Sequence, residues 1–90
     1  MFVEGLVTTK HDEIRRWVEE RNGWPVRIQI AIDGELEEEL GFAFSSQAQN
    51  QAAAPISWDE FWRRFEAARL AFVYQDKTAD GALSFSYSFL

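Results

Sequence analysis

The sequence predicts a single α+β domain in which two amphipathic helices cover one face of a mostly antiparallel sheet of four to five strands. Ninety residues are too few for two separate cores, so residues 1–90 are expected to form one domain. Hydrophobic residues make up 47% of the chain, which is enough to fill one core. The hydrophobic spacing switches between helical and period two along the chain, and the switches predict the order β-α-β-β-α-β-β.

The first part of the chain predicts a strand followed by a helix. Residues 3–9 are rich in β-forming side chains. Thr9 and Asp12, three residues apart, resemble a capping box at a helix start. The helix itself is indicated by four residues at helical spacing: Ile14, Trp17, Val18 and Arg21.

A hairpin is predicted next. Residues 26–32 alternate strictly between isoleucine or valine and other side chains, which is the period of a strand. Asp33 and Gly34 form a dipeptide typical of two-residue hairpin turns. Residues 36–44 are therefore expected to return as an antiparallel strand.

The second half of the chain predicts a loop, a helix and a final hairpin. Residues 45–55 contain no charged and no large apolar side chain, and they predict a flexible loop, with a short helix over residues 47–53 as the alternative. Ser57 and Glu60 form a capping box that predicts a helix start. Residues 70–74 and 83–89 have strand character and flank an Asp80-Gly81 turn, with Ser84, Ser86 and Ser88 expected on the solvent side.

Composition excludes several classes of function. Fifteen acidic against nine basic residues give a net charge of −6, so direct nucleic-acid binding through phosphates is not expected. With no Cys and one His, disulfides, thiolate zinc sites and Cys nucleophiles are excluded, and no cofactor or metal is predicted. No apolar run approaches the ~20 residues of a membrane span and no signal peptide is recognised, so a cytoplasmic protein without membrane contact is expected.

Two blocks of the sequence resemble a known family. They are HDEIRRWVEERNGWP (residues 11–25) and ISWDEFWRRFEAARLAFVYQDKTADG (residues 56–81), together about half of the chain. The blocks resemble a family of short uncharacterised bacterial proteins, some of which carry the label 1,4-α-glucan branching enzyme. The resemblance implies a small soluble bacterial protein and transfers no catalytic residue. Branching chemistry itself needs paired carboxylates across a deep sugar cleft, normally on a barrel of ~250 residues, and 90 residues cannot supply that scaffold.

An acidic turn is the main candidate interaction surface. It comprises Asp33, Glu35, Glu37, Glu38 and Glu39. These carboxylates either solvate and protect a sheet edge or recognise a basic protein partner. If they join Glu19 and Glu20 on one surface, they would imitate the phosphates of a nucleic acid, and the protein would inhibit a nucleic-acid-binding protein.

Two further residues are candidates for contacts with ligands. Trp24 lies between Gly23 and Pro25, outside any apolar stripe, and an exposed Trp there would anchor an interface. His11 is the one candidate general base, although it also fits the rim of the first helix, and no nucleophile motif accompanies it.

These observations favour a non-enzymatic protein-interaction or regulatory module. The alternatives are the nucleic-acid mimic, a sugar-binding protein that stacks its Trp side chains on sugars, and an enzymatic accessory protein. The first or last strand is expected to leave a free sheet edge, which would allow a homodimer.

Overall fold

The computed structural model describes residues 5–48 and 50–90. These residues form β1 (Leu6–Thr8), α1 (His11–Glu20), β2 (Gly23–Ile32), β3 (Glu35–Phe44), β4 (Ala53–Pro55), α2 (Trp58–Ala67), β5 (Phe72–Tyr74) and β6 (Tyr87–Phe89). The predicted α+β class is confirmed. The strands of the described part form two antiparallel sheets in the orders β1-β5-β6 and β3-β2-β4, where the sequence predicted one sheet. Residues 3 and 4 of the predicted first strand lie outside the described residues.

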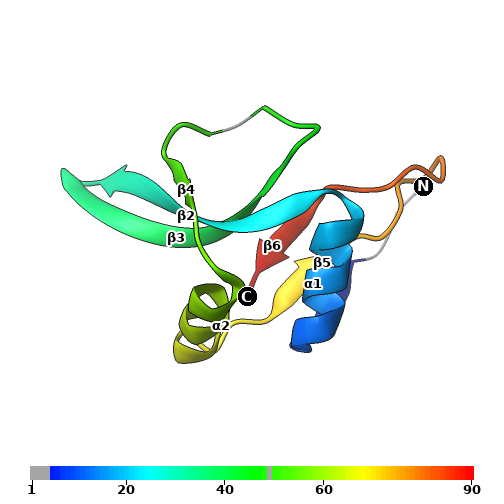
Figure 1. Cartoon of the computed structure of the whole chain (residues 1–90), viewed down its shortest axis with the longest axis horizontal. Coiled ribbons are helices and arrows are strands. Elements are labelled where there is room, and N and C mark those ends of the chain that lie inside the picture. Colours follow the sequence, from blue (N-terminus) through cyan, green and yellow to red (C-terminus); the bar gives the residue numbers. More distant parts are fainter. Residues whose placement is uncertain (1–4, 49) are drawn as a thin grey trace.

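The β2–β3 hairpin is the longest element and projects from the rest of the molecule. In Figure 1 it extends to the left beyond both helices, while α1 lies on the right and β6 near the middle. The third strand of its sheet, β4, pairs only with the segment of β2 from Val26 to Ile28. Beyond that segment the hairpin is two-stranded, and we call residues 29–39 the distal ribbon.

The two helices begin in different ways. Ser57 caps α2 as predicted, since its Oγ accepts a hydrogen bond from the N–H of Glu60 at 3.0 Å. The predicted capping box at Thr9 does not form, because α1 starts after Lys10, which provides no side-chain cap. The hydroxyl of Thr8 instead accepts from the N–H of Lys10 at 3.1 Å and donates to Glu13 at 3.2 Å. The last residue of β1 therefore supports the first turn of α1.

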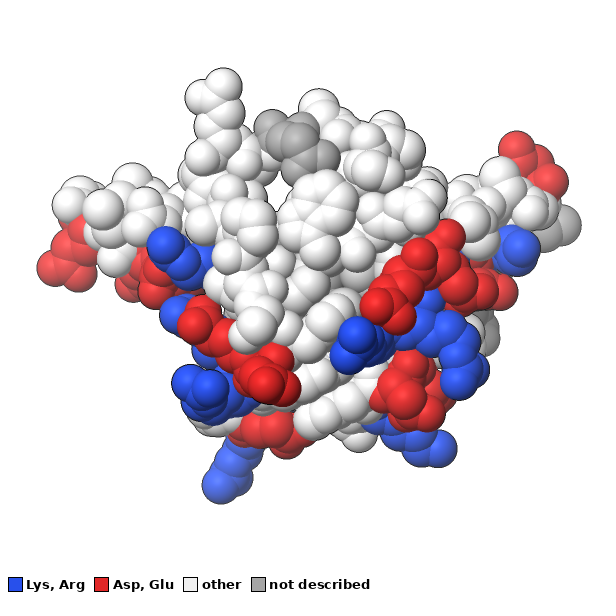
Figure 2. All heavy atoms as spheres, viewed as in Figure 1, with Lys and Arg blue, Asp and Glu red and all other residues white. Residues whose placement is uncertain are grey.

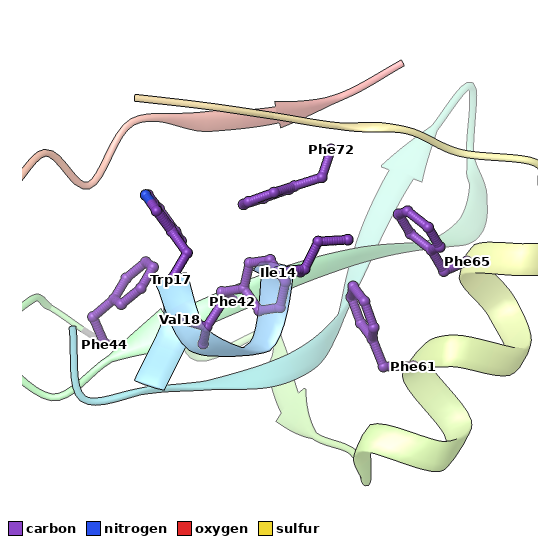
Figure 3. Close-up of a cluster of buried hydrophobic side chains, with 8 residues drawn as sticks. All are labelled: Ile14, Trp17, Val18, Phe42, Phe44, Phe61, Phe65 and Phe72. Carbon is purple, nitrogen blue, oxygen red and sulfur yellow. The ribbon is translucent and has the colours of Figure 1, made fainter. Parts of the chain in front are cut away.

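One hydrophobic cluster joins both helices and both sheets. Its buried members come from α1, β3, α2 and β5, and Figure 3 shows their side chains pointing toward one another: Ile14, Trp17, Val18, Phe42, Phe44, Phe61, Phe65 and Phe72. The aromatic rings of β3 and α2 meet directly, with Phe42 and Phe61 at 5.0 Å between ring centroids. The apolar residues at helical spacing in the helices and at period two in the strands therefore lie in the core.

The segment between β3 and α2 ends in a strand. Residues 45–48 and 50–52 form turns and a bend, and the helix considered for residues 47–53 is not seen in their described part. Ala53–Pro55 pairs with β2 as β4, which the uncharged composition of the segment did not indicate. Residue 49 of the predicted loop lies outside the described residues.

Arg21 links the connection between β5 and β6 to α1 by hydrogen bonds. Its side chain is fully buried and donates to the carbonyl oxygens of Ser84 at 2.5 Å, Asp76 at 2.7 Å and Trp17 at 2.8 Å. Burial lowers the pKa of the Arg21 guanidinium, while the hydrogen bond and charge of Asp76 oppose that shift. Ser84 is itself 3% exposed, so the prediction that it faces solvent is wrong, whereas Ser86 and Ser88 are exposed as predicted.

Candidate interaction surface

The turn at the tip sets which side chains share a face of the distal ribbon. Asp33 and Gly34 have φ values of 51° and 82°, as a two-residue hairpin turn requires. The register that follows places three isoleucines of β2 directly opposite three glutamates of β3: Ile28 with Glu39, Ile30 with Glu37 and Ile32 with Glu35. Directly opposite residues of an antiparallel pair lie on the same face. We call this surface the Ile–Glu face.

Glu38 lies on the opposite face and is held by two arginines. Its carboxylate is 2.7 Å from Nη1 of Arg27 on β2 and 3.4 Å from Nη1 of Arg64 on α2. These hydrogen bonds, with Arg27 contributing most, lower the pKa of Glu38 below its ordinary value. The predicted acidic turn is therefore divided, because Glu38 ties the hairpin to α2 while its neighbours point the other way.

In the described part of the structure, the carboxylates of the Ile–Glu face, those of Glu35, Glu37 and Glu39, are exposed and form no ion pair. Alternate residues of a strand lie about 7 Å apart, so the three charges form a regular row. Ile32, 42% exposed, adds apolar surface beside them. The face combines a negative row with an apolar row.

The two other members of the predicted surface lie at opposite ends of β2. Asp33 is exposed in the turn beside Glu35. Trp24 is opposite Ala43 near the base of the hairpin and is half-buried, so it does not join the ribbon tip. Asp33 therefore lies at the tip of the distal ribbon, and Trp24 lies at the base of the hairpin, outside the ribbon.

Glu19 and Glu20 do not join the ribbon carboxylates. They end α1, which Figure 1 places at the other side of the molecule from the hairpin tip, and Glu19 is 3.2 Å from Arg15. Figure 2 shows acidic and basic side chains interleaved over the helices, while the white atoms in the upper middle of this view belong to uncharged residues. This arrangement does not favour a phosphate-like array extending across the molecule.

His11 forms a contact between the helices. Its Nε2 lies 2.6 Å from Oε1 of Glu66, and its ring stacks on Trp62 at 4.0 Å between centroids with 2° between planes. The imidazole is thus oriented by an aromatic face and a carboxylate from α2. Sequence reasoning placed His11 at a helix rim and missed Glu66, since 55 residues separate the two and no local pattern links them.

A groove lies beside β3 on its side toward α2 and β6. Its volume is about 640 Å³, and its lining includes Ile28 of β2, Glu38, Glu39 and Leu40 of β3, Arg64 of α2, Leu70, and Tyr87 and Phe89 of β6. Apolar side chains dominate this set, with the Arg64–Glu38 ion pair at one side. No local sequence pattern indicates this groove, because its walls come from four segments that are far apart in the chain.

The described residues hold neither a metal cluster nor a membrane-spanning helix. Within residues 5–48 and 50–90, no three His, Cys, Asp or Glu side chains are grouped to hold a metal ion. The helices in that part are too short and too polar to cross a membrane. Comparisons with family models, curated proteins and solved structures found no match to this chain.

Proposed function

We propose that this protein is a non-enzymatic interaction module whose distal ribbon binds a basic protein partner. One observation carries the proposal: Glu35, Glu37 and Glu39 stand in a row on an exposed, projecting face, and no described side chain neutralises them. Such a row attracts Lys and Arg side chains. The exposed apolar surface of Ile32 beside it favours a protein over a small cation, because protein interfaces combine apolar and charged contacts.

Composition supports a cytoplasmic setting for the partner. The chain contains no Cys, which suits a reducing compartment, and its net charge of −6 disfavours a nucleic acid as the direct ligand. We therefore take the partner to be a basic protein of the bacterial cytoplasm, in line with the family that the sequence resembles.

The proposal is tested by neutralising the row. A bacterial lysate is passed over the immobilised protein, over the variant Glu35→Gln, Glu37→Gln and Glu39→Gln, and over a control variant. The control, Asp12→Asn, Glu20→Gln and Asp59→Asn, removes the same charge from exposed positions on α1 and α2. We expect a basic protein to be retained by the wild type and the control, and released as salt is raised.

The ribbon variant should lose that protein. If all three columns retain the same proteins, or none retains a specific one, the distal ribbon is not the binding surface and the proposal fails. Far-UV circular dichroism of the three proteins checks that the substitutions leave the fold intact.

A further inference from the structure

We propose that the free edge of β3, from Leu36 to Leu40, binds an extended peptide segment as an added strand, and that this segment alternates basic and apolar side chains. The inference rests on the proposed function and specifies how the basic partner binds. Strand addition requires the free backbone groups of β3 and the groove beside them. Attraction of a basic partner by the glutamates alone requires neither.

The register shows which backbone groups of β3 point away from β2. The N–H of Ser45 donates to the carbonyl of Asn22 at 3.1 Å, so this pair is hydrogen-bonded, and hydrogen-bonded pairs then recur at every second residue toward the tip. Glu35, Glu37 and Glu39 therefore use their N–H and C=O groups toward β2. The same groups of Leu36, Glu38 and Leu40 point outward, and β3 is an edge strand.

Tyr87 confirms this direction and marks where the open edge ends. The outward N–H of Phe42, the next residue in the series, donates to the hydroxyl of Tyr87 at 2.9 Å, and the hydroxyl lies 3.4 Å from the carbonyl of Phe42. Beyond Leu40 the edge is thus occupied by a side chain of β6. In the described structure the outward groups of Leu36, Glu38 and Leu40 have no hydrogen-bond partner.

The groove gives the added strand a place to lie. It borders β3 from Glu38 to Leu40, Glu39 included, and has a volume of about 640 Å³. Leu70 and Phe89 contribute apolar lining to it. A segment paired with β3 would therefore cover apolar surface as well as form backbone hydrogen bonds, which is the usual source of affinity in strand addition.

Charge determines the side chains that the segment carries. Residues added beside Glu35, Glu37 and Glu39 would lie on the Ile–Glu face, where Lys or Arg is favoured. Those beside Leu36 and Leu40 would lie on the other face, where apolar side chains are favoured. The charge of Glu38 on that face is already balanced by Arg27 and Arg64. Alternate basic and apolar residues match both faces.

A second copy of this chain is a poor occupant of the same edge. Pairing β3 with β3 of another molecule would place the row of glutamates beside an identical row. Like charges on adjacent strands destabilise the pairing, and acidic side chains are a known means of protecting sheet edges from self-association. The edge is therefore suited to a foreign basic strand.

The test uses two synthetic peptides of identical composition. Acetyl-KVKVKVK-amide alternates Lys and Val, whereas acetyl-KKKKVVV-amide has the same charge without alternation. Binding is measured at low salt by titrating the amide resonances of the ¹⁵N-labelled protein. We expect the alternating peptide to bind about tenfold or more tightly than the block peptide and to shift the amides of Leu36, Glu38 and Leu40.

Three variants distinguish the contribution of the β3 backbone N–H groups from that of the side chains. Leu36→Pro removes an outward N–H of β3 without touching the ladder to β2. Ala31→Pro is the control on the other edge of the ribbon. Ala31 is opposite Leu36 in a non-hydrogen-bonded pair, so its N–H points away from β3. Leu36→Ala removes the side chain and keeps the N–H. We expect Leu36→Pro to weaken binding of the alternating peptide about tenfold, while Ala31→Pro and Leu36→Ala retain it within about threefold.

Each other outcome overturns the inference in a recognisable way. Equal binding of both peptides, unaffected by Leu36→Pro, would mean attraction by charge alone, and the proposed function would stand without strand addition. A wild-type dimer in sedimentation that Leu36→Pro dissociates would assign the edge to a second copy. If neither peptide binds, strand addition is excluded for this class of segment, and the lysate experiment alone decides the proposed function.

Discussion

Arg21 joins three parts of the chain that are far apart in sequence. It follows the last turn of α1, and its guanidinium donates to carbonyls at Asp76 and Ser84 in the β5–β6 connection as well as to Trp17 of α1. The guanidinium also lies over the ring of Trp17, 4.1 Å from the ring centre. An arginine suits this place because its planar group donates several hydrogen bonds in fixed directions.

Replacing Arg21 with Met should lower the free energy of unfolding by about 3 kcal/mol, because three carbonyl oxygens lose their donor inside the protein. Urea denaturation measures the loss. Arg16→Met is the matched control, since Arg16 is exposed on the same helix, and its effect should stay within about 0.5 kcal/mol. Equal stability of the two variants would show that the Arg21 contacts contribute little.

Sequence reasoning recognised the position of Arg21 but not its role. Its helical spacing with Ile14, Trp17 and Val18 placed it on the buried face of α1. The acceptors lie 55 and 63 residues further along the chain, so nothing local identifies them. Ser84 was assigned to solvent for the same reason, since its burial depends on Arg21 and on Gln75, to which its hydroxyl donates at 2.6 Å.

At the scale of elements, local signals predicted the helices and turns well. The cap at Ser57 and the turns at Asp33-Gly34 and Asp80-Gly81 depend on a few adjacent residues, and all three are present. The division into two sheets depends on which strands meet, and short strands such as β4 carry too little pattern to reveal it. The first and last strands, β1 and β6, are both edge strands as expected.

The composition of the Ile–Glu face can be predicted from the sequence once the turn is known. A two-residue turn at Asp33 and Gly34 makes Ile32 the partner of Glu35, and every later pair follows from that one. Counting along the strands separates Glu38 from the other glutamates. Of its two arginine partners, the hairpin register brings Arg27 near Glu38. Arg64 is on α2, 26 residues away, and no local pattern links it to Glu38.

Glu38 connects β3 to α2, and its titration reports that connection. Its pKa in the folded protein lies below the ordinary value of 4.5, because Arg27 and Arg64 stabilise the charged form. The stabilisation is present above the pKa of the unfolded chain and is lost as the pH falls through the lower pKa of the folded protein. We therefore expect the link between the hairpin and α2 to weaken only below about pH 4.5.

The measurement is an NMR titration of the Glu38 carboxylate, whose midpoint should lie below the ordinary glutamate value. Arg64→Gln should raise the midpoint toward that value, and Arg27→Gln should raise it more, because Arg27 lies 2.7 Å from the carboxylate and Arg64 lies 3.4 Å from it. Arg63→Gln on the same helix is the control and should leave the midpoint unchanged. An ordinary midpoint in the wild type would mean that the two arginines do not hold Glu38 in solution.

The whole molecule depends on one core that neither sheet can complete alone. Phe72 of β5 and Phe61 of α2 both pack against Phe42 of β3, with ring centroids 5.7 Å and 5.0 Å from that of Phe42. Each sheet has three strands among the described residues, and a sheet of that size needs a covered apolar face for stability. The two sheets and two helices are therefore expected to fold and unfold together.

Phe42→Ala tests this dependence, because Phe42 is 7% exposed and contacts elements on both sides of the core. Far-UV circular dichroism, near-UV circular dichroism and Trp fluorescence of the wild type should give one coincident thermal transition. The substitution should shift all three signals together and lower the free energy of unfolding by about 3 to 5 kcal/mol. Ile32→Ala, at the exposed end of β2, should shift them by less than about 1 kcal/mol. Separate transitions for the aromatic and backbone signals would instead mean that the core packing is lost before the secondary structure, so that the sheets and helices do not unfold as one unit.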